Sequence, residues 1–107
     1  MITFRKLQDQ NALWVACNFG PHPAWHSLLG IVEEVGELSH AYLKREQRIR
    51  TNQNHNEAIR DAVADIVIYL ADFCTTEGID LGDQVDSTWR EVRKRDWKRD
   101  AANGGAA

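Results

Sequence analysis

Five acidic residues fall on two stretches of this chain with helical spacing, and their carboxylates suit a divalent cation. Glu33, Glu34 and Glu37 lie in an amphipathic stretch whose apolar residues recur every three or four positions. Side chains three and four apart share a helix face, so these carboxylates repel one another unless a cation lies between them. Asp61 and Asp65 repeat the four-residue spacing in a later, more apolar stretch. Mg²⁺ and Mn²⁺ prefer such oxygen ligands, so the pattern indicates a cation site.

The alternative is that these acids form a solvated face matched by lysine and arginine, as most exposed carboxylates do. Taken alone, Glu33 and Glu34 favour that interpretation. Asp65 does not, because apolar residues flank it on both sides and an unpaired charge there is costly. Taken together, the five acids favour metal binding.

Four helices are expected to position these residues. The apolar spacing and the capping residues predict helices over 4–18, 24–50, 57–77 and 81–98. Thr3, either Asn54 or Asn56, and Asp80 are the candidate caps. No strand pattern is visible, so we expect an all-α, four-helix bundle over 1–98. Residues 99–107 lack periodicity and are expected to form a disordered tail.

Composition places limits on the class of protein. A chain of 107 residues with 43% hydrophobic residues forms one small domain, which often gains stability by oligomerising. A net charge of −3 gives no case for a nucleic-acid or membrane partner. No apolar run approaches the roughly 20 residues of a membrane span, and no secretory signal is visible. Cys17 and Cys74 are expected to be buried free thiols, which fits the cytoplasm.

Aromatic and polar residues just upstream of the acidic helix are candidates for ligand binding. An aromatic ring there could stack on a nucleobase, while Asn18 or His22 could read the base edge. Trp14 is the candidate ring, although its spacing equally suits packing in the core.

Two acidic motifs carry a resemblance to a known family. The segment 33–37 (EEVGE) resembles the EExxE element of the MazG-like, all-α nucleoside triphosphate pyrophosphohydrolases. The segment 61–67 (DAVADIV) resembles the ExxD element of that family, and the likeness extends from the first helix to Trp97. Ala62 stands where the family has the glutamate of ExxD. Asp61 either replaces that ligand, if local geometry allows, or acts behind it by orienting a water.

The resemblance implies Mg²⁺-dependent cleavage of a nucleoside triphosphate to the monophosphate and pyrophosphate, for housecleaning or control of the nucleotide pool. It implies that Glu34, Glu37 and Asp65 bind the metal, with Asp61 as a further candidate. Mn²⁺ could replace Mg²⁺. Glu33 or Glu37 would orient or deprotonate the attacking water.

The family also uses basic residues of its last helix to contact the triphosphate. Arg95 and Lys98 are the corresponding candidates here, three apart in the sequence and so on one face of the helix predicted over 81–98, and Lys44 is a weaker third. Family members are typically dimers or tetramers, so a homodimer or homotetramer is expected. The broad apolar arc of the third helix fits such an interface.

Two other functions are compatible with the sequence. Glu37 and His40 form a Glu-x-x-His element, which is typical of ferritin-like di-iron bundles, but those proteins need a second such element and none is present. The chain could instead be a non-catalytic interaction or regulatory module of the same fold. Metal-dependent release of pyrophosphate separates these alternatives.

Overall fold

The computed structural model describes residues 1–102 and 104, and this part of the chain contains helices and turns but no strand. The helices are α1 (Phe4–Asn18), α2 (Ala24–Gln47), α3 (His55–Thr76) and α4 (Leu81–Val92). The all-α class and the order of four helices are therefore confirmed. Asn103 and residues 105–107, part of the expected tail, lie outside the described residues. None of the helices described here has the length and apolar character needed to cross a membrane.

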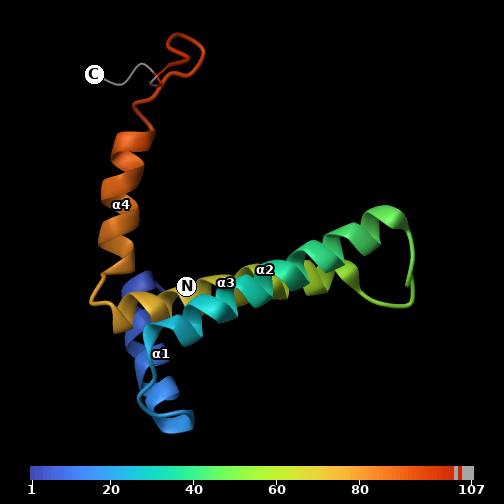
Figure 1. The fold of residues 1–107 in the computed structure, drawn as a ribbon, viewed down its shortest axis with the longest axis horizontal. Helices are drawn as coiled ribbons and strands as arrows, with labels where there is room; N and C mark the ends of the chain where they lie inside the picture. Colours follow the sequence, from blue (N-terminus) through green and yellow to red (C-terminus); the bar gives the residue numbers. More distant parts are fainter. Residues whose placement is uncertain (103, 105–107) are drawn as a thin grey trace.

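The helices are arranged as a long hairpin with two additions at one end. Figure 1 shows α2 and α3 running antiparallel, with α1 packed at the end away from their connection. The last helix, α4, projects away from the hairpin and has its main helix contact with α1. The loop between α1 and α2 therefore lies over the same end of the hairpin.

The starts of three helices are fixed by side-chain caps. Thr3 accepts a hydrogen bond from the first turn of α1 at 3.1 Å, Asn54 does so for α3 at 3.0 Å, and Asp80 for α4 at 2.9 Å. These bonds satisfy N–H groups that have no partner inside the helix. Thr3 and Asp80 are as predicted, and Asn54 rather than Asn56 caps α3.

The helix bounds differ from the predicted ones chiefly at the ends of α2 and α4, since α3 is only slightly displaced, at His55–Thr76 instead of 57–77. The residue after α2, Arg48, adopts a left-handed conformation (φ 56°, ψ 41°), so α2 ends at Gln47. The last helix, α4, ends at Val92, and the residues that follow form turns. A helix this short depends on tertiary packing. Val85 and Trp89 are 45% and 58% exposed. The later turns of α4 therefore gain little stability from packing against the rest of the chain.

A small core joins α1, α3 and α4. Ala71, Cys74 and Leu81 are buried together, with Leu7 and Leu70 packed against them. Cys74 is therefore buried as predicted, and burial raises the pKa of its thiol. The same prediction for Cys17 is wrong. Its side chain is exposed, because it lies on the side of α1 that faces solvent.

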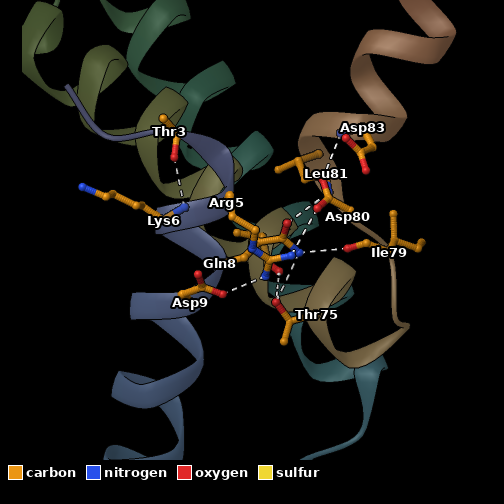
Figure 2. A network of polar contacts seen from close by, with 11 residues as sticks. Thr3, Arg5, Lys6, Gln8, Asp9, Thr75, Ile79, Asp80, Leu81 and Asp83 are labelled. Atoms are coloured by element: carbon orange, nitrogen blue, oxygen red, sulfur yellow. Dashed lines mark hydrogen bonds and ion pairs between the residues drawn. The ribbon is translucent and has the colours of Figure 1, made fainter.

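A buried glutamine adds a polar connection to this core. Gln8, 1% exposed, donates to Ile79 O at 2.9 Å and to Thr75 Oγ1 at 3.3 Å. Its Oε1 accepts from Leu81 N at 3.0 Å. Figure 2 shows how these bonds tie α1 to the end of α3 and the start of α4. An ion pair at 3.2 Å between Arg5 and Asp80 lies beside them.

The chain is open rather than compact. Its radius of gyration is 17.6 Å, whereas a compact chain of this length would have about 13 Å. Leu28, Val32, Val35 and Tyr42 form an apolar stripe along α2, and each is at least 46% exposed. The buried residues of α2 are Ser27, Glu34 and Ala41. An acidic residue thus lies on the inner face of α2, while much of its apolar face is exposed.

Candidate functional site

Three glutamates of α2 form a compact carboxylate cluster. One oxygen each of Glu33, Glu34 and Glu37 lies within 4.8 Å of the others. Glu34 is only 9% exposed, and its Oε2 has no hydrogen-bond partner in the part of the chain that the structure describes. Burial, together with the charges of Glu37, Asp65 and Glu33, raises the pKa of Glu34. A buried carboxylate among like charges is unfavourable unless a cation offsets them, so this position suits a cation.

The carboxylate of Asp65 approaches the cluster from α3. Asp65 is half-buried, lines the same cavity as Glu34, and its charge contributes to the raised pKa of that residue. Glu34 of α2 and Asp65 of α3 therefore face the same cavity, while the compact cluster itself consists of the three glutamates of α2.

Asp61 differs from Asp65 in its surroundings. It is exposed, and its neighbour Ala62 is buried at 3% exposure. The compact cluster found among the described residues includes neither Asp61 nor Asp65, but only Asp65 lines the cavity with Glu34 and contributes its charge to the raised pKa of Glu34. The structure thus gives Asp61 no direct place beside the three glutamates.

Tyr69 lies one turn beyond Asp65 and packs directly on α2. A Cβ added at Gly30 would lie 2.5 Å from Tyr69 Cε1, so only glycine lets the ring come so close. Tyr69 lines the cavity with Glu34 and Asp65. Burial and then the charges of the four neighbouring acids raise the pKa of its hydroxyl, which therefore stays protonated and can donate a hydrogen bond.

A cavity of about 1130 Å³ lies between α1, α2 and α3. Small-molecule sites commonly have about 300–1,000 Å³, so a nucleotide-sized ligand fits. Ser27 and Asp72 line one part of it, and Glu34 and Asp65 line another. Within each helix the two residues are seven positions apart, or about 10.5 Å at the helical rise. The cavity therefore joins an acidic end to a second polar end two turns away.

His22 closes this second end. Its Nε2 lies 2.6 Å from Asp72 Oδ2 and its Nδ1 lies 3.2 Å from Gly20 O. Both partners are acceptors, so both ring nitrogens donate when His22 is protonated. The bond to Asp72 is the main cause that raises the pKa of His22. Ser27 also donates to Asp72 Oδ2. The bond from His22 ties the α1–α2 loop to α3, and the bond from Ser27 ties α2 to α3.

The predicted ligand-binding residues of the N-terminal region have different positions. Trp14 and His22 line the cavity, and Trp14 is in edge contact with Phe19 at 5.6 Å. Asn18 donates its side-chain N–H to Trp14 O at 2.8 Å and does not line the cavity. Trp14 is 56% exposed, so it is a wall of the cavity rather than a core residue.

The basic candidates do not line this cavity. Lys44 is half-buried, with its Nζ 3.5 Å from Gln47 Oε1. Arg95 and Lys98 follow the end of α4, so the expectation that they share a face of one helix is wrong. His40 is exposed beside Arg50 and is not part of the carboxylate cluster identified in the described residues.

Sequence reasoning missed Asn11, Tyr69 and Asp72. Asn11 is 8% exposed, and its Oδ1 has no hydrogen-bond partner within residues 1–102 and 104. It follows Leu7 by four positions and precedes Trp14 by three, so it lies on the apolar side of α1. A polar residue on the apolar side of a helix is the sequence signal that could have identified Asn11 as a candidate binding residue. The argument used for Asp65, a charge within an apolar helix, applies equally to Asp72.

Comparison with family models, with curated proteins and with solved structures finds no match to this chain.

Proposed function

We propose that this protein is a Mg²⁺-dependent nucleoside triphosphate pyrophosphohydrolase, which cleaves a nucleoside or deoxynucleoside triphosphate to the monophosphate and pyrophosphate. The observation that carries this proposal is the buried, unpartnered oxygen of Glu34 among three other carboxylates at the edge of a nucleotide-sized cavity. The resemblance of 33–37 and 61–67 to the MazG-like motifs supports it from the sequence.

The donor set fits a hard cation. Carboxylate oxygens are the protein ligands that Mg²⁺ prefers, and Mg²⁺ keeps several waters and binds substrate phosphates as well. Glu34, Glu37 and Asp65 would hold the ion, with Asp61 able to act only through a water or after a local rearrangement. Bound there, Mg²⁺ would neutralise charge on the phosphates and lower the pKa of a coordinated water.

The side chains around the ion have separate roles in this proposal. Glu33 or Glu37, both exposed to solvent, would orient the attacking water and accept its proton. General-base catalysis of this kind contributes about 10²–10⁴-fold. Attack on the α-phosphorus breaks its bond to the oxygen that bridges to the β-phosphorus. The protonated hydroxyl of Tyr69 would donate to a phosphate oxygen beside the acids.

The rest of the cavity would hold the nucleoside. Trp14 offers an aromatic wall that can stack on a base. His22 would act by fixing the loop, because both of its ring nitrogens already face acceptors. The separation of about 10.5 Å between the acidic end and the Asp72 end can be bridged by a sugar and its phosphates.

A second copy of the chain would complete the site. The apolar stripe of α2 is exposed, the radius of gyration is large for the length, and Arg95 and Lys98 lie outside the cavity of their own chain. A homodimer or homotetramer would cover the stripe and could bring these cations to the triphosphate. Size-exclusion chromatography with light scattering should therefore report two or four copies, and a monomer would contradict this part of the proposal.

Product analysis tests the function. Canonical and modified nucleoside triphosphates are incubated with protein and Mg²⁺ or Mn²⁺, and pyrophosphate and orthophosphate are measured separately. We expect pyrophosphate, with the rate lowered at least about 10²-fold by Glu37→Gln. Glu46→Gln is the matched control, because Glu46 is exposed on the same helix and pairs with Arg45. Orthophosphate would indicate cleavage of another bond, and no product with any substrate would favour a non-catalytic module.

A further inference from the structure

One residue that lines the cavity has a buried polar atom that makes no hydrogen bond to the described part of the chain. Asn11 Oδ1 is buried and has no hydrogen-bond partner among the described residues, and Asn11 lines the cavity from α1. A buried acceptor without a partner costs free energy, commonly about 1–3 kcal/mol, so it is tolerated where a ligand satisfies it. By contrast, the neighbouring Gln8 uses its side-chain amide fully within the protein.

At the Asp72 end of the cavity, Ser27 and His22 already direct their donors to acceptors of the protein. Ser27 donates its hydroxyl hydrogen to Asp72. His22 directs one nitrogen to Asp72 and the other to Gly20 O. Asp72 has a second carboxyl oxygen, and Asn11, which lines the same cavity, has an Oδ1 without a partner among the described residues. A ligand group rich in N–H donors matches this set.

We propose that Asn11 determines which nucleobase is bound, by accepting an N–H from the exocyclic amino group of an adenine or cytosine base. This proposal rests on the function proposed above, which places a nucleotide in the cavity. An amino group presents two N–H donors to an acceptor-rich surface. The carbonyl at the same position of hypoxanthine or uracil offers no N–H to Asn11 Oδ1, so these bases bind more weakly.

Asn11 is thus retained at a cost to the unbound protein. Substitution by leucine, an apolar residue of similar shape, removes the unpartnered acceptor and leaves a good helix former in α1. The unbound variant should be at least as stable as the wild type while it loses the preference between bases. A merely structural asparagine would give the opposite pattern.

The test uses matched nucleosides that differ at this one position: adenosine with inosine, and cytidine with uridine. Binding to the full chain is measured by NMR titration without divalent cations, so neither phosphate nor catalysis enters the result. In at least one pair the amino nucleoside should bind about tenfold more tightly, the value of one buried hydrogen bond. Asn11→Leu and Asn11→Ala should each remove that difference, and Asn52→Ala, at an exposed residue of the α2–α3 connection, should keep it.

Two results would overturn the proposal. One is equal or tighter binding of the carbonyl nucleosides in both pairs. The other is a preference that persists in whichever Asn11 variant is folded, as judged by its circular dichroism. Failure of the proposed function looks different, because a protein that hydrolyses no triphosphate could still distinguish the nucleosides. Conversely, an active enzyme whose Asn11 variants keep the preference for amino nucleosides would support the proposed function and exclude the proposed role of Asn11.

Discussion

Two glycines of α2 provide a matched test of how Tyr69 packs at the acidic site. In the middle of a helix, glycine costs about 1 kcal/mol relative to alanine. At Gly36 an added Cβ meets nothing within 4 Å. Gly36→Ala should therefore raise the free energy of unfolding by about 1 kcal/mol. This corresponds to a rise in Tm of about 4–8 °C for a domain of this size.

Gly30→Ala should behave differently. Its Cβ would lie 2.5 Å from Tyr69 Cε1, whereas carbon atoms in contact are about 3.5–4.0 Å apart. The ring must withdraw by about 1 Å or more, and overpacking of this kind costs about 1–3 kcal/mol. Set against the same helix gain of about 1 kcal/mol, the net change ranges from about zero to a loss of about 2 kcal/mol.

Urea denaturation followed by circular dichroism measures both free energies. We expect Gly30→Ala to be less stable than Gly36→Ala by about 1–3 kcal/mol, with equal denaturant slopes. Triphosphate hydrolysis should also fall in Gly30→Ala, because the Tyr69 hydroxyl moves away from the carboxylates. Equal stabilisation by both substitutions would refute the packing of Tyr69 on Gly30.

Three further predictions concern charge and capping. The raised pKa of His22 means that its bond to Asp72 stabilises the fold fully below about pH 6.5 and progressively less as the pH rises through the folded-state value. Thermal melts between pH 5.5 and 8.5 should show the deficit of His22→Gln shrinking as the pH rises, while His40→Gln follows the wild type. Asp80→Ala should cost about 0.5–2 kcal/mol in urea denaturation, because it removes the cap of α4, and Asp80→Asn should cost less; equal losses would exclude the capping role. Glu34→Gln should raise Tm in the presence of EDTA by relieving repulsion and should abolish the rise in Tm caused by millimolar Mg²⁺; a variant that still responds to Mg²⁺ would speak against Glu34 as a ligand.

Helical periodicity predicted the number, order and approximate bounds of the helices, because these features depend mainly on residues close together in the sequence. The caps Thr3 and Asp80 and the stops after α1 and α3 depend on a few neighbouring residues. The acidic spacing likewise placed Glu33, Glu34 and Glu37 together, since residues three and four apart share a helix face. The extent of α4 depends instead on packing with other elements, and the charged stretch after Val92 has no local signal that ends a helix.

The non-local parts of the site were harder to predict. The bond between His22 and Asp72 joins residues 50 positions apart, and only the antiparallel register of α2 and α3 together with the preceding loop brings them together. Asn11 and Gln8 both lie on the inner side of α1, but only the fold reveals that the amide of Gln8 is hydrogen-bonded within the protein while Asn11 Oδ1 has no partner among the described residues. The apolar residues of α2 were recognised from their spacing, but spacing does not determine which of them the same chain covers.

Binding of Mn²⁺, observed by electron paramagnetic resonance, tests most directly whether carboxylates of two helices share one cation. The free-ion signal should fall as protein is added, and excess Mg²⁺ should restore it. Asp65→Asn, on α3, should weaken binding, as should Glu34→Gln on α2. An unchanged free-ion signal with the wild type, or an affinity that Asp65→Asn leaves intact, would contradict a site formed between α2 and α3.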